Sequence, residues 1–354
     1  MSNLFILHTQ YNIILGASVL IEKYQDSQND LIVYAEFKLS PEYKNHLEQV
    51  FNRVLYIRDE FKPLIIGFWN IEHHLKNEYD LFKNSEFHKT KYDNVFISQD
   101  RPLEHLILGR CKQINPKCEC FDIEEGCYYS LTPQNNDPNR QRKWQTKRPF
   151  LYRKLRYGKL YYSEEYRCPI DGEASYFDGI YAIFPNLIRK ELFHKHAYEV
   201  KSKNIIEAIQ RLYSYVSVDI PYSKDYVLVF FDLMNRYKNK AAIKDVVEYI
   251  VNSIDSCKTT ILLKYHPRET EKFVFSQANI IEIPSIIPAE KLLCDLHGKD
   301  VTVFGNATTS IIVAQKFGFK TISIAGIEGS NNIHMINKFR EMGIEVPDSI
   351  EEIK

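Results

Sequence analysis

Residues 300–325 read DVTVFGNATTSIIVAQKFGFKTISIA, and this stretch decides the fold. The apolar run Asp300–Phe304 predicts a buried strand, Gly305-Asn306 a turn, and Ala307–Phe317 a helix. A second apolar run at Thr321–Ala325 predicts another strand directly after the helix. A strand, a helix and a strand in this order form a βαβ unit, so the two strands should lie parallel in a sheet that helices cover.

The same alternation continues upstream of this unit. Apolar residues from Ile243 to Ile254 recur at i, i+3, i+4 and i+7, the spacing of an amphipathic helix, and a similar stripe runs from Ile205 to Val216. These elements predict a doubly wound α/β domain from about residue 205 to 330, with a tail helix at about 331–342. Its further predicted elements are strands at Tyr226–Phe231, Thr259–Tyr265 and Ile280–Ile283 and a helix at Pro288–Leu296.

The first half of the chain alternates in the same way, and a length of 354 residues favours two domains. We therefore predict an α/β fold of GT-B type, in which two Rossmann-like, doubly wound domains face a cleft. The N-terminal domain is expected at 1–200 and the C-terminal domain at 201–354. Predicted strands in the first half are Leu4–His8, Leu31–Ala35, Val54–Ile57, Leu64–Phe68, Asn94–Ser98, Glu119–Ile123 and Gly179–Phe184, and predicted helices are Gln10–Lys23, Glu42–Val50 and Pro102–Cys111.

Composition narrows the classes of function. Lys and Arg number 46 and Asp and Glu also number 46, so the overall charge does not favour nucleic-acid binding. No run of 18 apolar residues is present, and the N-terminus lacks the basic start and long apolar core of a signal peptide. We expect a cytoplasmic protein, or one that is peripheral on the cytoplasmic face of the inner membrane.

Sequence motifs for cofactors and metals are missing. The chain has neither a GxGxxG fingerprint nor a phosphate-binding P-loop motif. Its seven cysteines form no CxxC pair of the kind that holds zinc, and they suit a reducing compartment. We therefore expect no cofactor and no metal.

Three polar motifs each follow a predicted strand, where ligands bind in open α/β sheets. The first is Glu124-Glu125-Gly126. In a strand the two carboxylates point to opposite faces, so one of them can act as a general base toward a hydroxyl. Gly126 lets the backbone turn. The alternative interpretation is a solvated acidic turn.

The second motif is His266-Pro267-Arg268. Pro267 holds His266 in an extended conformation, which aims the imidazole at the strand end. Histidine is well suited to donate a proton near neutral pH, and Arg268 is suited to bind an anion. The alternative is a histidine at a strand edge with no role.

The third motif is Gly305-Asn306-Ala307-Thr308-Thr309-Ser310, between a strand and a helix. Hydroxyl groups, free backbone N–H groups and the positive end of the helix dipole together make an anion site. The alternative is ordinary N-capping by Asn306 or Thr308, which needs only one such side chain.

Basic and aromatic residues alternate between Arg140 and Lys159. This stretch is suited to an anionic acceptor glycan or to anionic membrane lipids, and the alternative is a solvated loop. The residues assigned to this acceptor or membrane patch are Arg140, Arg142, Lys143, Lys147, Arg148, Arg153, Lys154 and Arg156.

Taken in order, the three motifs resemble those of bacterial sialyltransferases and polysialyltransferases. Those enzymes carry an acidic-acidic-Gly motif in the first domain and a His-Pro motif followed by a Ser/Thr-rich motif in the second. The local sequence is most similar to glycosyltransferase family 52, the lipooligosaccharide sialyltransferase group. Phe121–Gly126 resembles its acidic strand end, His266-Pro267-Arg268 its His-Pro-Arg, and Asn3–Gln10 its first strand and turn. Thr308-Thr309-Ser310 stands where relatives often carry paired serines or small residues.

The resemblance implies a metal-independent, inverting transfer of sialic acid from CMP-sialic acid to a hydroxyl of a bacterial surface glycan, either lipooligosaccharide or capsule. The implied partners are a CMP-sugar donor, a glycan or glycolipid acceptor and the inner membrane. Glu124 would take the acceptor proton, Glu125 and Gly126 would support the acidic loop, and His266 would donate to the departing phosphate. The donor would be bound by Pro267, Arg268, Gly305, Asn306, Thr308, Thr309 and Ser310.

Three other functions fit the same motifs. One is a transferase for another CMP-activated acidic sugar, such as Kdo, legionaminic acid or pseudaminic acid. A second is a non-catalytic binding protein with a GT-B-like fold. A third is a nucleotide-sugar epimerase of the same fold class, which would use a UDP-sugar and need no acceptor.

Overall fold

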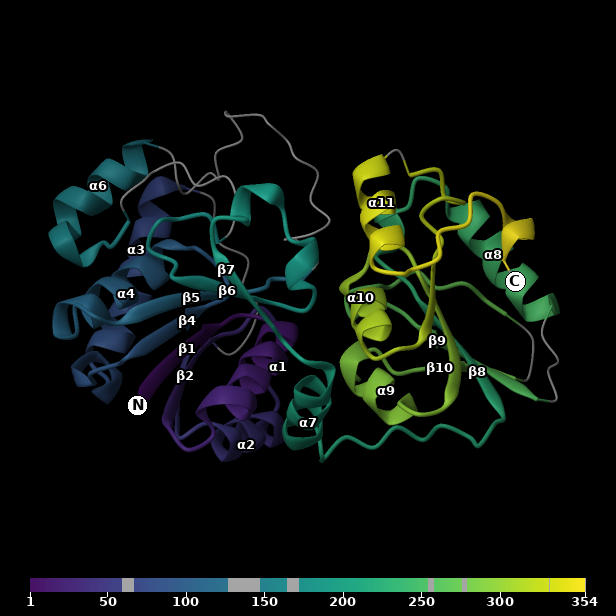
Figure 1. The fold of residues 1–354 in the computed structure, drawn as a ribbon, viewed down its shortest axis with the longest axis horizontal. Coiled ribbons are helices and arrows are strands. Elements are labelled where there is room, and N and C mark those ends of the chain that lie inside the picture. Colours follow the sequence, from purple (N-terminus) through teal and green to yellow (C-terminus); the bar gives the residue numbers. More distant parts are fainter. Residues whose placement is uncertain are drawn as a thin grey trace. The chain divides into compact units, whose positions relative to one another are not determined.

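The computed structural model describes residues 1–58, 67–126, 147–163, 172–253, 258–275, 279–330 and 332–353 (Figure 1). The described residues up to Tyr213 form one compact unit, unit 1, and those from Ser214 onward form unit 2. Each unit contains one parallel β-sheet with helices on both faces. The prediction of an α/β fold of GT-B type, with two Rossmann-like doubly wound units, is confirmed.

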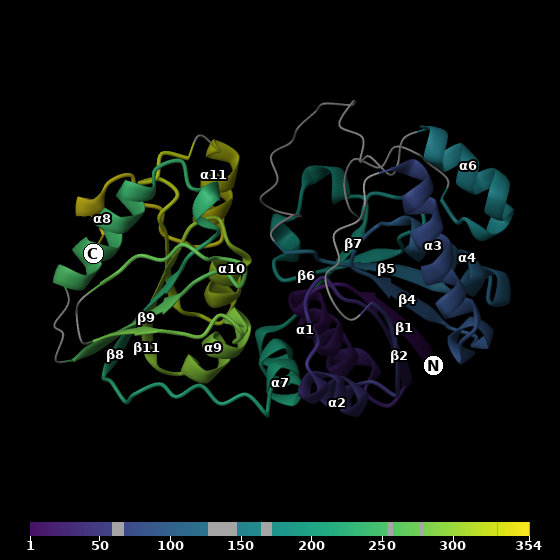
Figure 2. The same cartoon turned by 180° about the vertical axis from the view of Figure 1, so that it is seen from behind.

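Unit 1 is built on a seven-stranded parallel sheet in the order β3-β2-β1-β4-β5-β6-β7. Figures 1 and 2 show helices on both faces of this sheet. One face carries α1 (Gln10–Val19), α2 (Pro41–Val50) and α7 (Ser202–Leu212), and the other carries α3 (Phe68–Lys83), α4 (Pro102–Ile114) and α6 (Lys147–Tyr157). The strands are β1 (Ser2–Leu7), β2 (Gln28–Tyr34), β3 (Arg53–Arg58), β4 (Asn94–Ile97), β5 (Glu119–Ile123), β6 (Gly179–Ala182) and β7 (His196–Glu199).

The central strand and the helix after it show why these residues fold this way. Leu4–Leu7 are fully buried, as expected for a parallel strand that has helices on both faces. Thr9 ends this apolar run and caps α1, because its side chain accepts from the Asn12 N–H while the Asn12 side chain accepts from the Thr9 N–H.

Sequence and structure differ at several elements of unit 1. The predicted helix Gln10–Lys23 is α1, which continues as a π-helical turn over Leu20–Tyr24. The predicted strand Leu64–Phe68 falls mostly outside the described residues, and its last residue begins α3. The sequence pattern predicts neither α3 nor β7. β7 reads HAYE and lies at the sheet edge, so it lacks the apolar run by which a buried strand is recognised.

Unit 2 is built on a five-stranded parallel sheet in the order β10-β9-β8-β11-β12. All five predicted strands are confirmed within two residues. They are β8 (Asp225–Phe230), β9 (Thr259–Lys264), β10 (Ile280–Glu282), β11 (Asp300–Gly305) and β12 (Lys320–Ser323). The helices are α8 (Lys240–Ser253), α9 (Ala289–Leu296), α10 (Thr309–Lys316) and α11 (Ile333–Glu341), and the stretch 300–325 is the βαβ unit β11-α10-β12.

The division between the units lies after Tyr213 rather than after residue 200. α7 separates the two positions, and it packs on α1 and α2 of unit 1. Asn204 donates a 3.0 Å hydrogen bond to Glu22, and Tyr213 stacks on Tyr43 with ring centroids 5.0 Å apart. The apolar stripe of α7 is therefore buried against unit 1, although the sequence places this helix at the start of the second half.

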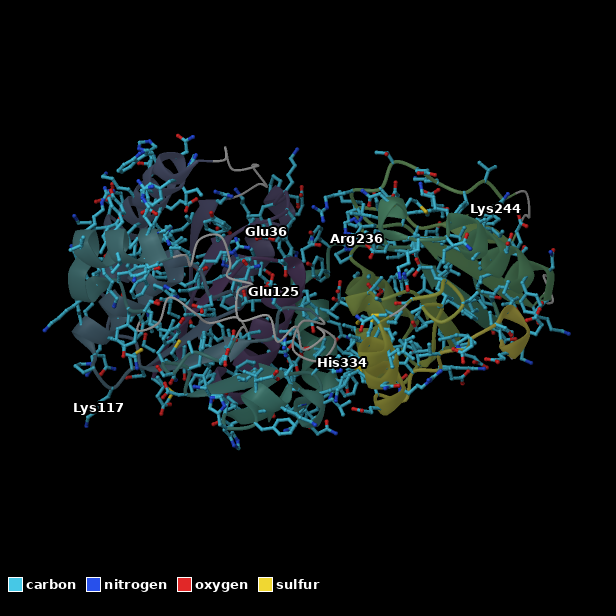
Figure 3. All side chains as sticks on the ribbon, turned by 90° about the horizontal axis from the view of Figure 1, so that it is seen from above. Glu36, Lys117, Glu125, Arg236, Lys244 and His334 are labelled. Carbon is cyan, nitrogen blue, oxygen red and sulfur yellow. The ribbon has the colours of Figure 1, made fainter. Side chains whose placement is uncertain are left out.

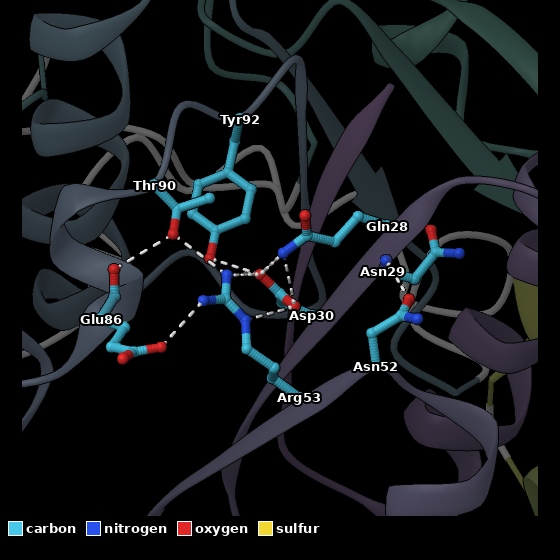
Figure 4. Close-up of polar contacts among 8 residues, drawn as sticks. All are labelled: Gln28, Asn29, Asp30, Asn52, Arg53, Glu86, Thr90 and Tyr92. Carbon is cyan, nitrogen blue, oxygen red and sulfur yellow. Dashed lines mark hydrogen bonds and ion pairs between the residues drawn. The ribbon is translucent and has the colours of Figure 1, made fainter.

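A network of polar side chains closes the amino edge of the unit 1 sheet (Figure 4). Asp30 is fully buried, accepts a 2.8 Å hydrogen bond from the Tyr92 hydroxyl, and is paired with Arg53, whose Nε donates at 3.0 Å. Arg53 also donates to Thr90. These bonds join β2, β3 and the segment before β4, so the charges at this edge are satisfied within the fold and serve its structure.

Candidate functional site

Strand order reverses beside the first strand of each sheet, between β1 and β4 in unit 1 and between β8 and β11 in unit 2. Ligands of open α/β sheets bind outside the carboxyl ends of the strands at such a switch point. All three predicted motifs lie at carboxyl ends: the acidic motif after β5, the histidine motif after β9 and the hydroxyl motif after β11.

The acidic pair of unit 1 is held on both sides. Glu124 is only 3% exposed, and its Oε2 accepts a 2.7 Å hydrogen bond from the N–H of Ile183, directly after β6. Glu125 is half-buried, and its Oε1 accepts from Gln99, the second residue after β4. The two carboxylates are thus bonded to the segments that follow β4 and β6, the two strands that flank β5. Gly126 follows with φ +59°, a left-handed conformation that favours glycine.

A polar network that the motifs do not reveal surrounds this edge. His8, directly after β1, bonds Glu104 of α4 at 2.5 Å, and both side chains are 1% exposed. His8 Nδ1 and Glu104 Oε2 have no hydrogen-bond partner among the described residues. Asp100, after β4, bonds His105 and Tyr176. In the sequence, the signal that could indicate this network is the polar run Gln99-Asp100-Arg101, which follows an apolar strand.

Arg101 links two further strand ends through its ion pair with Glu36, which follows β2. Burial raises the pKa of Glu36, but the charges of Arg101 and His8 more than offset this, so the pKa lies below its ordinary value. Glu125 and Glu104 also stabilise the charge of Arg101. Figure 3 labels Glu36 and Glu125 at the same end of unit 1. This edge therefore gathers several carboxylates around the guanidinium of Arg101.

His266 of unit 2 is oriented by its own motif. Its Nδ1 accepts a 3.1 Å hydrogen bond from the N–H of Arg268, so the ring proton of the neutral form lies on Nε2. Burial lowers the pKa of His266, the cations Arg268, Arg236 and Lys264 lower it further, and Asp232 opposes them. The ring is therefore a neutral hydrogen-bond donor near pH 7. Pro267 and Arg268 are exposed beside it.

Glu269 is a positioning residue that the sequence motifs do not indicate. Its Oε2 accepts from the N–H of Met234 at 2.5 Å, and its Oε1 accepts from the N–H groups of Thr270 and Glu271. These bonds hold the pKa of Glu269 below its ordinary value. They also tie the loop after β9 to the loop after β8, which fixes the segment that carries His266.

The hydroxyl motif begins with a close packing of backbone and side chain. A Cβ on Gly305 would lie 2.5 Å from Cγ2 of Ile311 and only 3.5 Å from Cβ of Phe230, so glycine lets β11 run straight into α10. Thr308 precedes the first helical residue of α10 and makes no side-chain capping bond. Thr309 and Ser310 begin the helix and are half-buried.

Two polar atoms of this motif are buried without a hydrogen-bond partner among the described residues, Asn306 Oδ1 and Thr308 Oγ1. Asn306 is 8% exposed, and its Nδ2 donates to Glu328 at 3.3 Å. The capping alternative is therefore wrong for Thr308, and the first-turn N–H groups of α10 keep their capacity for an anion. β8 alone separates β9 from β11, so the histidine and hydroxyl motifs lie about 10 Å apart across the edge.

Only some residues of the basic patch are exposed on the surface. Arg140, Arg142 and Lys143 lie outside the described residues. Lys147, Arg148 and Arg156 are exposed on α6, and Lys154 donates to the carbonyl of Tyr161 at 2.9 Å. Arg153 is 1% exposed and paired with buried Glu72, so it anchors α6 and cannot meet an acceptor. In the part of the stretch that the structure describes, Lys147–Tyr157 is the helix α6, which corrects the alternative interpretation of this part as a loop.

In the described ranges, no group of three or more His, Cys, Asp or Glu side chains is placed to hold a metal ion. No helix there has both the length and the apolar character needed to cross a bilayer. Cys111, Cys118, Cys120 and Cys294 are free thiols.

Solved structures with a similar fold come from nucleotide-sugar enzymes. A UDP-GlcNAc 2-epimerase of Methanocaldococcus jannaschii, in complex with UDP-GlcNAc and UDP, is similar with a TM-score of 0.53 and 14% identity over 99% of this chain and 90% of that one. A UDP-GlcNAc 2-epimerase of Neisseria meningitidis bound to UDP-GlcNAc gives 0.51 and 13% over 98% and 95%. A glycosyltransferase of Streptomyces nogalater gives 0.50 and 9% over 99% and 97%.

These likenesses establish the fold of the chain, which is of GT-B type. The sequence itself matches no protein-family model and no curated protein.

Proposed function

We propose that this protein is an inverting glycosyltransferase that moves sialic acid from CMP-sialic acid to a hydroxyl of a bacterial surface glycan. The observation that carries the proposal is the carboxyl edge of unit 2. At this edge His266, neutral and with its proton on Nε2, follows β9. The helix α10, which has no side-chain cap, follows β11, and the segment between them holds two polar atoms without a hydrogen-bond partner among the described residues. Only β8 lies between these two strands. The edge therefore offers donors to a phosphate, which is the leaving group of a CMP-sugar.

In this proposal unit 2 binds the donor. The N–H groups of α10 and the hydroxyls of Thr308, Thr309 and Ser310 hold the phosphate, and Arg268 adds a positive charge. His266 donates its Nε2–H to the oxygen that departs with CMP as the bond to the anomeric carbon breaks. One such donor at a developing oxyanion lowers the barrier by about 2.7–4 kcal/mol. The residues thus stabilise charge, and the reaction needs no metal.

Unit 1 binds the acceptor and supplies the base. Glu124 takes the proton of the acceptor hydroxyl as its oxygen attacks the anomeric carbon from the face opposite to CMP, which inverts the configuration there. The N–H of Ile183 fixes the direction of that carboxylate. Glu125, bonded to Gln99, orients the loop. The exposed cations of α6 are proposed to attract an anionic acceptor or the inner membrane.

The first experiment is calorimetric titration of the protein with CMP, CDP, UDP and GDP in the absence of metal. Selective CMP binding that is lost in Thr308→Ala supports the proposal. Lys203→Gln, an exposed position on α7, is the matched control and should bind like the unaltered protein. Selective UDP binding, or no nucleotide binding at all, overturns the proposed donor.

A second candidate is the epimerisation of a UDP-sugar. The observation that favours it is the likeness to two UDP-GlcNAc 2-epimerases over nearly the whole chain. Both candidates would place a nucleotide sugar at the edge of unit 2, and the base of the nucleotide separates them. Turnover of UDP-GlcNAc without an acceptor supports epimerisation, whereas release of CMP that depends on an acceptor supports transfer.

A further inference from the structure

A basic pocket lies in unit 1 outside the proposed catalytic residues. It has a volume of about 330 Å³ and is formed by α3, α4, the end of α6 and the short turn that contains His88. Figures 1 and 2 show these helices on one face of the sheet. α4 begins at the carboxyl edge and ends at the amino edge, so Arg110 lies about 13 Å along the helix from Arg101. None of the pocket residues is a catalytic or donor-binding residue of the proposed function, which uses only Arg156 among them, as one of the exposed cations of α6.

The pocket has an excess of positive charge. Lys76 is paired with Asp80, the acidic residue of its lining. Lys83, Arg110 and Arg156 also line it, and no carboxylate of the described residues forms an ion pair with any of the three. All three line the same pocket. Burial lowers the pKa of His88 in this lining, and the charges of Arg110 and Lys83 lower it further.

Two phenols complete the lining. Tyr157 Oη is buried and has no hydrogen-bond partner among the described residues. Burial raises the pKa of Tyr157 and raises that of Tyr79 to about 12, so both hydroxyls stay protonated and able to donate. The two rings meet edge to face with centroids 6.4 Å apart. Arg156 donates to the Tyr152 hydroxyl and Arg110 to the carbonyl of His88, so both keep further N–H groups but have no carboxylate partner among the described residues. The pocket thus joins three cations that lack an ion pair to an unsatisfied donor and an aromatic wall.

We propose that this pocket binds a phosphate-bearing ligand, with the phosphate held by Lys83, Arg110 and Arg156. A guanidinium can donate two parallel hydrogen bonds to phosphate oxygens. Three cations also suit a ligand with two negative charges, such as phosphate, better than a ligand with one, such as a carboxylate. The volume is at the lower end of the range of about 300–1,000 Å³ for small-molecule sites, so the pocket takes a phosphate and a ring-sized group rather than a whole nucleotide sugar.

The phosphate group can come from a soluble molecule or from a lipid headgroup. The same elements expose leucines, namely Leu81 of α3 at 50% and Leu151 and Leu155 of α6 at 47% and 87%. A lipid would bring an apolar surface to such side chains, whereas a soluble phosphate would not. The experiment therefore has two arms.

In the first arm, inorganic phosphate is added to the full chain, and the His88 ring resonance is followed by NMR. Because His88 lines the pocket, its signal separates this site from phosphate bound in unit 2. In the second arm, the protein is sedimented with phosphatidylcholine vesicles that contain or lack phosphatidylglycerol. Both arms are repeated with Arg110→Gln, Arg156→Gln and Tyr157→Phe, and with Lys203→Gln as the matched control on the opposite face.

We expect a saturable shift of the His88 signal, with the dissociation constant raised about tenfold in Arg110→Gln and in Arg156→Gln and unchanged in Lys203→Gln. Arg110 also donates to the carbonyl of His88, so Arg156→Gln and Tyr157→Phe keep the test valid if Arg110→Gln fails to fold. Vesicle binding that requires phosphatidylglycerol and is lost in the pocket variants identifies a lipid source. The proposal is overturned if the pocket variants bind with unchanged affinity in either arm, or if the unaltered protein binds in neither arm. Neither result bears on the donor site of unit 2.

Discussion

His266 has one ring nitrogen occupied by the N–H of Arg268, and its surroundings disfavour the charged form. The ring of His266 is therefore protonated only at a lower pH than the ring of an exposed histidine. We expect an NMR titration of its ring proton, assigned through His266→Asn, to give a midpoint below the ordinary value of 6.5. Donor turnover that depends on the neutral ring should persist as pH falls through 6.5 and decline only near the lowered midpoint. Arg268→Gln removes a repelling charge and should move the midpoint upward, and a midpoint at or above 6.5 in the unaltered protein would contradict this account.

The two acidic residues should separate in their effects. We expect Glu124→Gln to lower transfer about 100-fold or more while CMP binding is kept, because a general base contributes roughly 10²–10⁴ in rate. Glu125→Gln keeps a hydrogen-bonding side chain beside Gln99 and should lose less than tenfold. Steady-state kinetics with CMP-sialic acid, together with calorimetry, measures both variants. Near-normal transfer by Glu124→Gln would remove it as the base.

The three motifs are visible in the sequence, but the polar network around them is not. The acidic, histidine and hydroxyl motifs could be placed at strand ends because each directly follows an apolar run. The pairs His8–Glu104 and Arg101–Glu36 join residues 96 and 65 positions apart, so no local pattern reveals them. The same long separation hides the partner of Arg153, because Glu72 lies 81 positions away, so the local pattern wrongly predicts a surface residue there.

At the scale of elements, one buried ion pair fixes α6 to α3. Both side chains of Arg153 and Glu72 are 1% exposed. Arg153→Met should lower the free energy of unfolding of unit 1 by about 3–5 kcal/mol, because it leaves a buried carboxylate without its partner. Trp69 lies in α3 of unit 1, so urea unfolding followed by its fluorescence reports this unit.

Two variants control that measurement. Arg156→Met, at an exposed position of the same helix, should change the stability by less than about 0.5 kcal/mol. Glu72→Gln combined with Arg153→Met removes the unpaired charge and should recover part of the loss. If Arg153→Met and Arg156→Met unfold at the same urea concentration, the buried pair does not hold α6.

The junction of β11 and α10 depends on the absence of a side chain at Gly305. Gly305→Ala places a Cβ 2.5 Å from Ile311, which is fully buried and cannot move away. We expect the free energy of unfolding of unit 2 to fall by about 1–3 kcal/mol, as overpacking does elsewhere. Calorimetric unfolding measures the loss, and tryptophan fluorescence of unit 1 should not change. Ile311→Ala removes the clashing methyl, so Gly305→Ala should be less harmful in that background, and equal losses in both backgrounds would exclude the clash.

For the whole molecule, the periodicity of the second half predicts the elements of unit 2 closely but not the point where the unit begins. The stripe Ile205, Ile209 and Leu212 correctly indicates an amphipathic helix, and all three side chains are at most 1% exposed. A stripe shows that a helix has a buried face but not which sheet that face covers. The structure answers this through contacts with Glu22 and Tyr43 of unit 1, which lie far upstream in the sequence.

The two positions of the boundary make different predictions for fragments. A fragment of residues 214–354 contains the complete five-stranded sheet and its own core, so it should fold alone and bind CMP within about threefold of the full chain. A fragment of residues 201–354 carries α7 without the surface of unit 1 that covers it, so it exposes an apolar stripe and should aggregate at lower concentration. Circular dichroism, light scattering and calorimetry compare the two. If the longer fragment is the more soluble and the shorter one is unfolded, then α7 belongs to the second unit after all, and the division after Tyr213 is wrong.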